Sequence, residues 1–337
     1  MKRKKALPAV YLLLSISLIF QPARTEEEDG AGRIHSPAEI YKIMEESNLV
    51  YTFTYYGGQE EEKELTSILP GRFRVSEDSA AVNKVLLEYD YSPVVEEFIL
   101  KGDSLRSMNK YADAVACYIN AWDQGGRYYH PALIKTGNCY FAQGLYDSAA
   151  VYFRRAIEGN FMSYQAHWFL SDCYFYLDRV EDAYRELLTA HLLNINHDML
   201  FNQLKKLRTR MERPWKDWGI NPRYEIKEKE GKIVISAPPE WLAYAMVKAV
   251  WRYEPGYSDS MSGSTEGTPT ASTLEEREAM AAHLAVNPDD RLDRIIRDGY
   301  ADEMLIYEII AREYPILLAL IDDDTFSKII EYVDRYH

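Results

Sequence analysis

The feature that most constrains this chain is a pattern that returns three times between residues 95 and 197, at steps of 35 and 34 residues. Ala114, Ala149 and Ala183 mark its register. A large apolar residue follows each of them, then a second alanine, and a small residue and an apolar one precede each. These aligned positions are Tyr118, Phe153 and Leu187; Ala121, Ala156 and Ala190; Gly102, Gly137 and Ser171; and Leu105, Tyr140 and Tyr174. Such a period predicts stacked helical pairs that bury their apolar faces against neighbouring repeats.

Over about a hundred residues the chain therefore resembles the tetratricopeptide-repeat proteins, whose unit of 34 residues is a pair of short helices. Small residues stand where the two backbones approach, and large apolar residues fill the remaining space. Lys101 and Thr136 depart from the leucine usual in the family. The resemblance implies a mainly α fold with a three-repeat solenoid over 95–197 and, with it, a role in protein binding.

The resemblance also implies which side chains would line a binding groove. In the family, the first helix of each repeat faces a concave surface, and those helices are expected here to begin at Val95, His130 and Tyr164. The implied lining is apolar, aromatic and mildly acidic. It comprises Ile99, Asp103, Arg106, Ile134, Asn138, Phe141, Trp168, Asp172, Phe175 and Tyr176. The family members that clamp a terminal carboxylate use Lys and Arg at the positions of Ile99, Ile134 and Trp168, so that subclass is disfavoured.

Within this groove we expect Trp168, Asp172 and Phe175 to dominate the binding energy, because their spacing places them on one helix face. Two large aromatics beside a carboxylate suit an extended or helical segment that carries apolar anchors and a Lys or Arg. The alternative is that the chain's own terminal segments cover these aromatics, which would make Trp168 a core residue.

The composition narrows the classes of partner. The 337 residues exceed the usual size of one compact core, so two or three units are expected. The formal net charge is −14 and the sequence pI is about 5.1. This acidic balance argues against nucleic acids and anionic membranes as partners, because their phosphates are bound by clusters of Lys and Arg.

The first 23 residues have the pattern of a signal peptide. Four basic residues, from Lys2 to Lys5, precede an apolar run over 7–20 that is short for a membrane span. Cleavage after Ala23 predicts export to the periplasm or the medium, and an uncleaved N-terminal anchor is the alternative. The segment carries no cysteine for lipid attachment.

Residues 24–94 are expected to form a small α/β segment. Ser36 and Glu39 make a capping box with Pro37 at the first helical position, which predicts a helix over 37–47. A strand is expected over 49–56, with 73–76 as its candidate partner and an acidic loop between them. We expect these strands to cover the first repeat.

Residues 198–254 are expected to form a capping helix over 198–211, a β-hairpin from 224–226 and 232–236, and a buried apolar helix over 241–253. The Ser, Gly and Thr of 255–272 predict a flexible linker. A helical unit over 273–337 then begins with a capping box of Thr273 and Glu276 and continues with helices over 290–298, 301–313 and 325–335. The three acids from Asp322 to Asp324 are expected to serve the dipole of the last helix rather than to bind calcium.

Three cysteines, Cys117, Cys139 and Cys173, all lie inside the repeats and are expected to be buried as small apolar residues. A bridge between Cys117 and Cys139 is the alternative.

A search for catalytic, cofactor-binding and metal-binding motifs finds none. The metalloprotease, phosphate-loop, dinucleotide and nucleophile-elbow signatures are all missing, and His191 and His197 have no completing ligands nearby. The sequence therefore favours a non-catalytic scaffold of the bacterial cell envelope that binds a protein or peptide. The alternatives are a carbohydrate- or cell-wall-binding protein, which the aromatic residues would permit, and an enzyme with an unrecognised site.

Overall fold

The computed structural model describes residues 33–54, 56, 73–77, 84–88, 92–125, 130–262 and 273–337. The chain divides into two compact units. The first, called here the α/β unit, combines Met1–Glu64 with Trp218–Ile310, and the second, called the array unit, combines Leu65–Asp217 with Ala311–His337. The expected signal peptide lies outside the described residues. Among the described helices, none has the length and apolarity that crossing a membrane requires.

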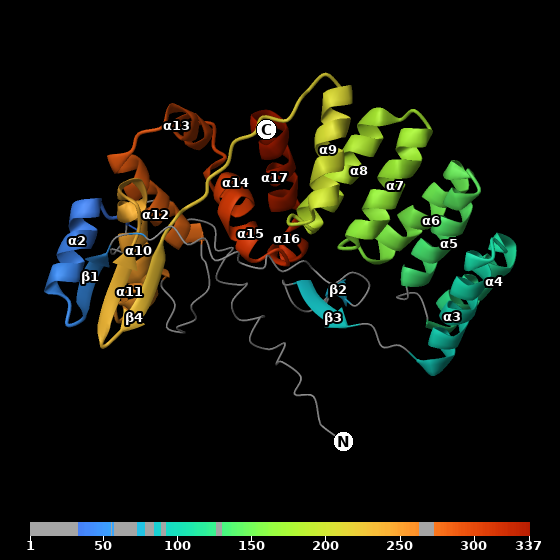
Figure 1. The fold of residues 1–337 in the computed structure, drawn as a ribbon, viewed down its shortest axis with the longest axis horizontal. Helices are drawn as coiled ribbons and strands as arrows, with labels where there is room; N and C mark the ends of the chain where they lie inside the picture. The colour runs from blue at the N-terminus through green and yellow to red at the C-terminus, as the bar shows by residue number, and fades with distance from the viewer. Residues whose placement is uncertain are drawn as a thin grey trace. The chain divides into compact units, whose positions relative to one another are not determined.

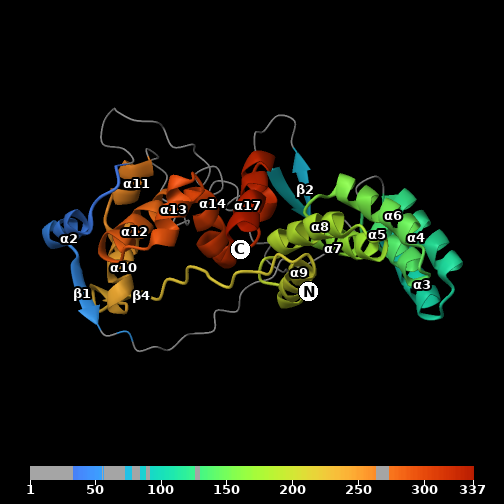
Figure 2. The same ribbon diagram turned by 90° about the horizontal axis from the view of Figure 1, so that it is seen from above.

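The array unit is built from successive helical pairs, which follow one another side by side in Figure 1 and Figure 2. The pairs are α3 (Pro93–Ser107) with α4 (Tyr111–Gly125), α5 (His130–Ala142) with α6 (Tyr146–Gly159), and α7 (Tyr164–Tyr176) with α8 (Val180–Leu193). A seventh helix, α9 (Asp198–Arg210), follows α8. The predicted three-repeat solenoid and its capping helix are both confirmed.

The repeat pattern is the core of this unit. The three register alanines, the large apolar residues four positions later and the alanines that follow them are all completely buried. A Cβ atom at Gly102 would lie 2.5 Å from the ring of Tyr118, and one at Gly137 would lie 2.6 Å from Phe153. Glycine therefore allows the two helices of a pair to approach. In the third repeat Ser171 occupies this position, and its hydroxyl donates to the carbonyl of Ala183 at 2.7 Å.

The C-terminal residues return to the array unit as α15 (Ala311–Glu313), α16 (Leu317–Leu320) and α17 (Asp323–Tyr336). Asp322 caps α17 by accepting from the backbone of Thr325, as expected for the acidic run. The Tyr184 hydroxyl of α8 donates to Asp334 of α17, and the rings of Phe161 and Phe326 meet edge to face at 5.4 Å. The same unit holds an antiparallel hairpin of β2 (Phe73–Glu77) and β3 (Lys84–Glu88).

The α/β unit joins the two ends of its sequence in one sheet. The predicted hairpin is confirmed as β4 (Glu225–Lys229) and β5 (Lys232–Ser236). Strand β1 (Val50–Thr54) pairs with β5 in parallel, so the sheet order is β1-β5-β4. The expected partner of β1 was therefore wrong, because 73–77 pairs with β3 instead.

Helix α10 (Leu242–Tyr253), which is buried along most of its length, packs against this sheet. Helix α2 (Pro37–Glu46), which has the predicted capping box, and the short 3-10 helix η1 (Pro239–Trp241) pack on α10. Further along lie α11 (Tyr257–Ser262), α12 (Thr273–Val286), α13 (Asp290–Arg297), α14 (Ala301–Leu305) and the π-helical segment η2 (Ile306–Ile310).

Two expectations about the later part of the chain differ from the structure. The expected linker begins with α11, whose Tyr257 and Met261 are buried, while residues 263–272 lie outside the described residues. The expected C-terminal unit over 273–337 is divided between the two units, since Thr273–Ile310 belongs to one and Ala311–His337 to the other. Glu276, expected in a capping box, instead faces α10, where its carboxylate accepts from Tyr244 and Lys248.

All three cysteines are free and buried, so the alternative of a bridge between Cys117 and Cys139 is wrong. Burial raises the pKa of Cys139, and it raises that of Cys173 to about 12. Both thiols therefore remain protonated at neutral pH and serve as core residues.

Candidate protein-binding site

The first helices of the repeats present their predicted lining residues in three columns along the array. The fifth positions are Ile99, Ile134 and Trp168; the ninth are Asp103, Asn138 and Asp172; the twelfth are Arg106, Phe141 and Phe175. The side chains become more exposed from the fifth positions to the twelfth. Ile134 is buried and Ile99 packs against two apolar clusters, whereas Arg106 and Phe175 are exposed. The twelfth positions therefore form the accessible edge.

Helix α9 extends every column by one residue, although the sequence reasoning treated it only as a cap. Gln203, Leu207 and Arg210 follow Trp168, Asp172 and Phe175 at the repeat spacing of 35 residues. Leu207 is buried, whereas Arg210 is exposed. The spacing alone could have revealed this fourth first helix, but its residues share no chemistry with those they follow.

The Asp103 carboxylate is already engaged within the array. Lys135 of α5 donates to both of its oxygens, at 2.8 and 2.9 Å, and the Tyr118 hydroxyl donates at 2.7 Å. Burial opposes ionisation of Asp103, but the hydrogen bonds from Lys135 and Tyr118 outweigh it and hold its pKa below the usual value. This group ties α3 to α5 and has little capacity left for a basic ligand.

Trp168 and Asp172 are bridged by one side chain of α9. The Trp168 indole N–H donates to Gln203 Oε1 at 2.7 Å, and Gln203 Nε2 donates to Asp172 at 2.7 Å. The Trp168 ring also meets His197 edge to face at 5.5 Å. Burial raises the pKa of Asp172, against the effect of the Gln203 hydrogen bond. The chain's own α9 therefore occupies the polar groups of both residues.

The remaining aromatic residues form a connected surface, named here the aromatic rim: Phe141, Tyr146, Phe175 and Tyr176. The rings of Tyr146 and Tyr176 stack at 4.6 Å, and Phe141 meets them edge to face at 5.2 and 5.6 Å. Phe175 lies against Tyr176 at 5.9 Å. Phe175 is 37% exposed and Tyr176 58% exposed, so the surface is preformed and accessible. Tyr146, which belongs to a second helix, was missed because the sequence reasoning followed first helices only.

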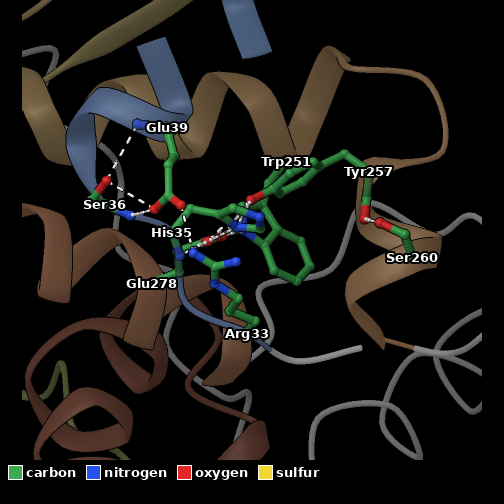
Figure 3. A network of polar contacts seen from close by, with 8 residues as sticks. All are labelled: Arg33, His35, Ser36, Glu39, Trp251, Tyr257, Ser260 and Glu278. Atoms are coloured by element: carbon green, nitrogen blue, oxygen red, sulfur yellow. Dashed lines mark hydrogen bonds and ion pairs between the residues drawn. The ribbon is translucent and has the colours of Figure 1, made fainter. Parts of the chain in front are cut away.

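The α/β unit contains a different kind of cluster, centred on the completely buried Glu278 (Figure 3). Its carboxylate accepts from the Trp251 indole at 2.6 Å, from the Tyr257 hydroxyl at 3.0 Å and from the backbone N–H of His35 at 2.9 Å. The His35 ring Nδ1 lies 2.8 Å away. These contacts fasten the segment before α2 to α10, α11 and α12, which is a structural role.

A second buried cluster in this unit is an ion-paired lysine. Lys248 of α10 lies 2.5 Å from Glu275 and 2.7 Å from Glu276. Burial disfavours the charged amine, but the two carboxylates outweigh it and hold the pKa of Lys248 above its usual value. A lysine held charged in this way serves neither as base nor as nucleophile. Among the described residues, no group of three or more His, Cys, Asp or Glu is arranged to hold a metal ion.

The repeats match a known sequence family. Residues 99–163 and 137–192 match the sequence model of the tetratricopeptide repeat. Two solved structures similar to this chain are the first such domain of human RPAP3, with 20% identity over 35% of this chain and 93% of that chain, and the Sgt2 domain from Aspergillus fumigatus, with 17% identity over 36% and 81%. A third is the Yersinia enterocolitica type III secretion chaperone SycD in complex with a peptide of the translocator YopD, with 16% identity over 36% and 97%. Their TM-scores are 0.33, 0.34 and 0.33. No curated protein matches the chain.

Proposed function

Because residues 99–192 carry tetratricopeptide repeats, we propose that this protein is a non-catalytic scaffold that binds a segment of another protein at the aromatic rim. Repeat arrays of this kind use extended concave surfaces for binding. The array also supplies neighbouring first helices at a fixed spacing, which is suited to a ligand that runs across several of them.

One observation carries this proposal: three polar side chains of the predicted lining are satisfied internally, while Phe175 and Tyr176 of the aromatic rim are exposed. Asp103, Trp168 and Asp172 bond to Lys135 or Gln203. By contrast, Phe175 and Tyr176 present large apolar area that is already ordered by ring contacts. Aromatic residues are enriched in protein interfaces because they bury much area at a low cost in conformational entropy. This moves the expected energetic centre from Trp168 and Asp172 to Phe175 and Tyr176.

We also propose that the scaffold works outside the cytoplasm, in the bacterial cell envelope. The support is the charged start and short apolar run of residues 1–23. N-terminal sequencing of the fractionated protein tests this location. Mature protein that lacks these residues is expected in the envelope or the medium, and cytoplasmic protein that retains Met1 would contradict it.

The binding proposal is tested with the purified full chain immobilised and exposed to an envelope fraction of its host. We expect one partner protein in stoichiometric amount, and Tyr176→Ala to weaken its binding by about 2 kcal/mol or more, which is about 30-fold. Tyr41→Ala is the matched control, because Tyr41 is also an exposed tyrosine, 45% accessible, but lies on α2 of the other unit.

Two results would overturn the proposal. Partner binding that is unchanged in Tyr176→Ala would place the binding surface elsewhere. Retention on purified cell-wall polymer, with loss of retention in Tyr176→Ala and no protein partner, would assign the same aromatic surface to carbohydrate instead.

A further inference from the structure

We infer that the ligand of the aromatic rim is an extended acidic peptide segment of another protein, with an aromatic or large aliphatic anchor beside an Asp or Glu. This inference rests on the proposed function and names the chemistry of its partner. It reverses the charge that the sequence suggested, since a mildly acidic groove favours a basic ligand. The reversal follows from which charged groups of the concave face are already paired.

The two carboxylates expected to attract a basic ligand are held by the chain itself. Asp103 is matched by Lys135, and Arg106 stands on the same face, so one anion is set against two cations there. Asp172 accepts from Gln203, and burial raises its pKa, which disfavours its charged form. Both acidic side chains of the lining are therefore already engaged within the fold, Asp103 by the cation Lys135 and Asp172 by the amide of Gln203.

Arg210 is a basic side chain in direct contact with the aromatic rim. Its guanidinium carbon lies 4.7 Å from the centroid of the Phe175 ring, and its side chain is exposed. Among the described residues Arg210 forms no ion pair. Stacking on a ring uses the face of the guanidinium and leaves the N–H groups at its edge available. Those groups match a carboxylate in a two-point hydrogen bond.

The neighbours of Arg210 supply the apolar half of the recognition. Phe175 lies directly beside it, Tyr176 contacts Phe175, and both rings expose the aromatic surface on which an anchor side chain can pack. Asp147 follows Tyr146 and is exposed, so the acid of the ligand is expected at the α9 end of the rim rather than at this end. A ligand whose anchor side chain packs on these rings, and whose neighbouring carboxylate binds Arg210, covers the rings and the guanidinium at the same time.

The net charge of the chain, −14, repels an acidic ligand at long range. Salt screens that repulsion beyond about 8 Å at physiological ionic strength. A preference for acidic segments is therefore expected to arise from direct contact with Arg210, and removing this one side chain should reduce it. The dependence on one residue makes the inference testable.

The test is selection of random peptides on the purified full chain, followed by affinity measurement of the enriched peptides. We expect an aromatic or Leu anchor next to Asp or Glu, and Arg210→Glu to weaken binding about 10-fold or more. The affinity of Arg210→Lys should lie between those of the wild type and Arg210→Glu, since lysine keeps the charge but lacks the planar two-point geometry. Arg252→Glu is the matched control, because Arg252 stacks on Tyr253 at 5.2 Å in the other unit.

Enrichment of Lys and Arg, or affinity that is the same in Arg210→Glu, would overturn the acidic ligand. If Tyr176→Ala still fails to bind the selected peptides in either case, the rim remains the binding surface and only its charge preference is refuted. If no selected peptide depends on Tyr176, or if no peptide is enriched, both the inference and the proposed function fail.

Discussion

In the array unit, Gly102 packs against Tyr118 within the same helical pair, whereas in the α/β unit Val50 pairs with Lys232 across most of the chain. The array is made of contacts between neighbours in sequence, and each pair of helices repeats the same solution. The α/β unit instead depends on a few contacts that join its two distant segments. A destabilising substitution should therefore weaken only the neighbouring helices in the array, whereas in the α/β unit it should weaken the whole unit.

The largest expected effect is at Glu278. Glu278→Ala leaves the donors of Trp251, Tyr257 and His35 without their shared acceptor. We expect a loss of about 3–5 kcal/mol in the free energy of unfolding of the α/β unit. Amide hydrogen exchange should show lost protection throughout α2, α10 and α12, with protection of α3 to α8 unchanged.

Glu240→Ala is the control for this substitution, because Glu240 pairs with Arg223 at the surface and such pairs contribute at most about 1 kcal/mol. Loss of protection confined to α12 would show that Glu278 does not join the two segments.

The matching test in the array is Gly137→Val. Its Cβ would meet Phe153 at 2.6 Å, so the ring or the helix must shift. Overpacking of this kind is expected to cost about 2–3 kcal/mol and to reduce exchange protection mainly in α5 and α6. Ser148→Ala, at an exposed site on α6, should change stability by less than about 0.5 kcal/mol. Loss of protection across every repeat would contradict the local character of the array.

A somewhat smaller effect is expected from His191, which is buried in α8 and stacks on Phe201 at 5.1 Å. Burial, together with the charges of Arg312 and His337, lowers its pKa to about 3. The unfolded chain binds this proton near pH 6.5, so stability is lost as the pH falls from about 6.5 towards 3. At pH 5 the loss attributable to this group is about 2 kcal/mol.

Denaturant unfolding at pH 7.5 and pH 5.0 checks this prediction. His191→Gln should lose about 2 kcal/mol less than the wild type between the two pH values. Equal losses in the two proteins would show that His191 is protonated in the folded state.

The same contrast explains which parts of the structure could be predicted from sequence. The array was predictable because its period repeats the small and large residues that pack together, such as Gly137 with Phe153. Pairing of β1 with β5 was not, because Val50 carries no local signal for a partner beyond the array. The α11 helix was obscured by the Ser and Gly around it, although Tyr257 and Met261 stand at helical spacing.

The candidate site divides in the same way. Its lining residues followed from the repeat register, and the structure places them along the first helices. Their partners did not follow, since Gln203 belongs to the helix that the sequence marked only as a cap. Only the contacts of Gln203 and Lys135 reveal that the acidic residues of the groove are already paired.

Helix α9 makes Trp168 part of the folded core of the array, so the aromatic rim is the surface that remains for a partner. Measuring the free energy of unfolding and the partner affinity of Trp168→Ala and Tyr176→Ala tests it most directly. Trp168→Ala should destabilise the array by about 2 kcal/mol or more, because it removes packing and the Gln203 hydrogen bond. Tyr176→Ala should change stability by less than about 0.5 kcal/mol and weaken partner binding about 30-fold. If Trp168→Ala is stable but cannot bind, or if Tyr176→Ala binds normally, the claim is contradicted.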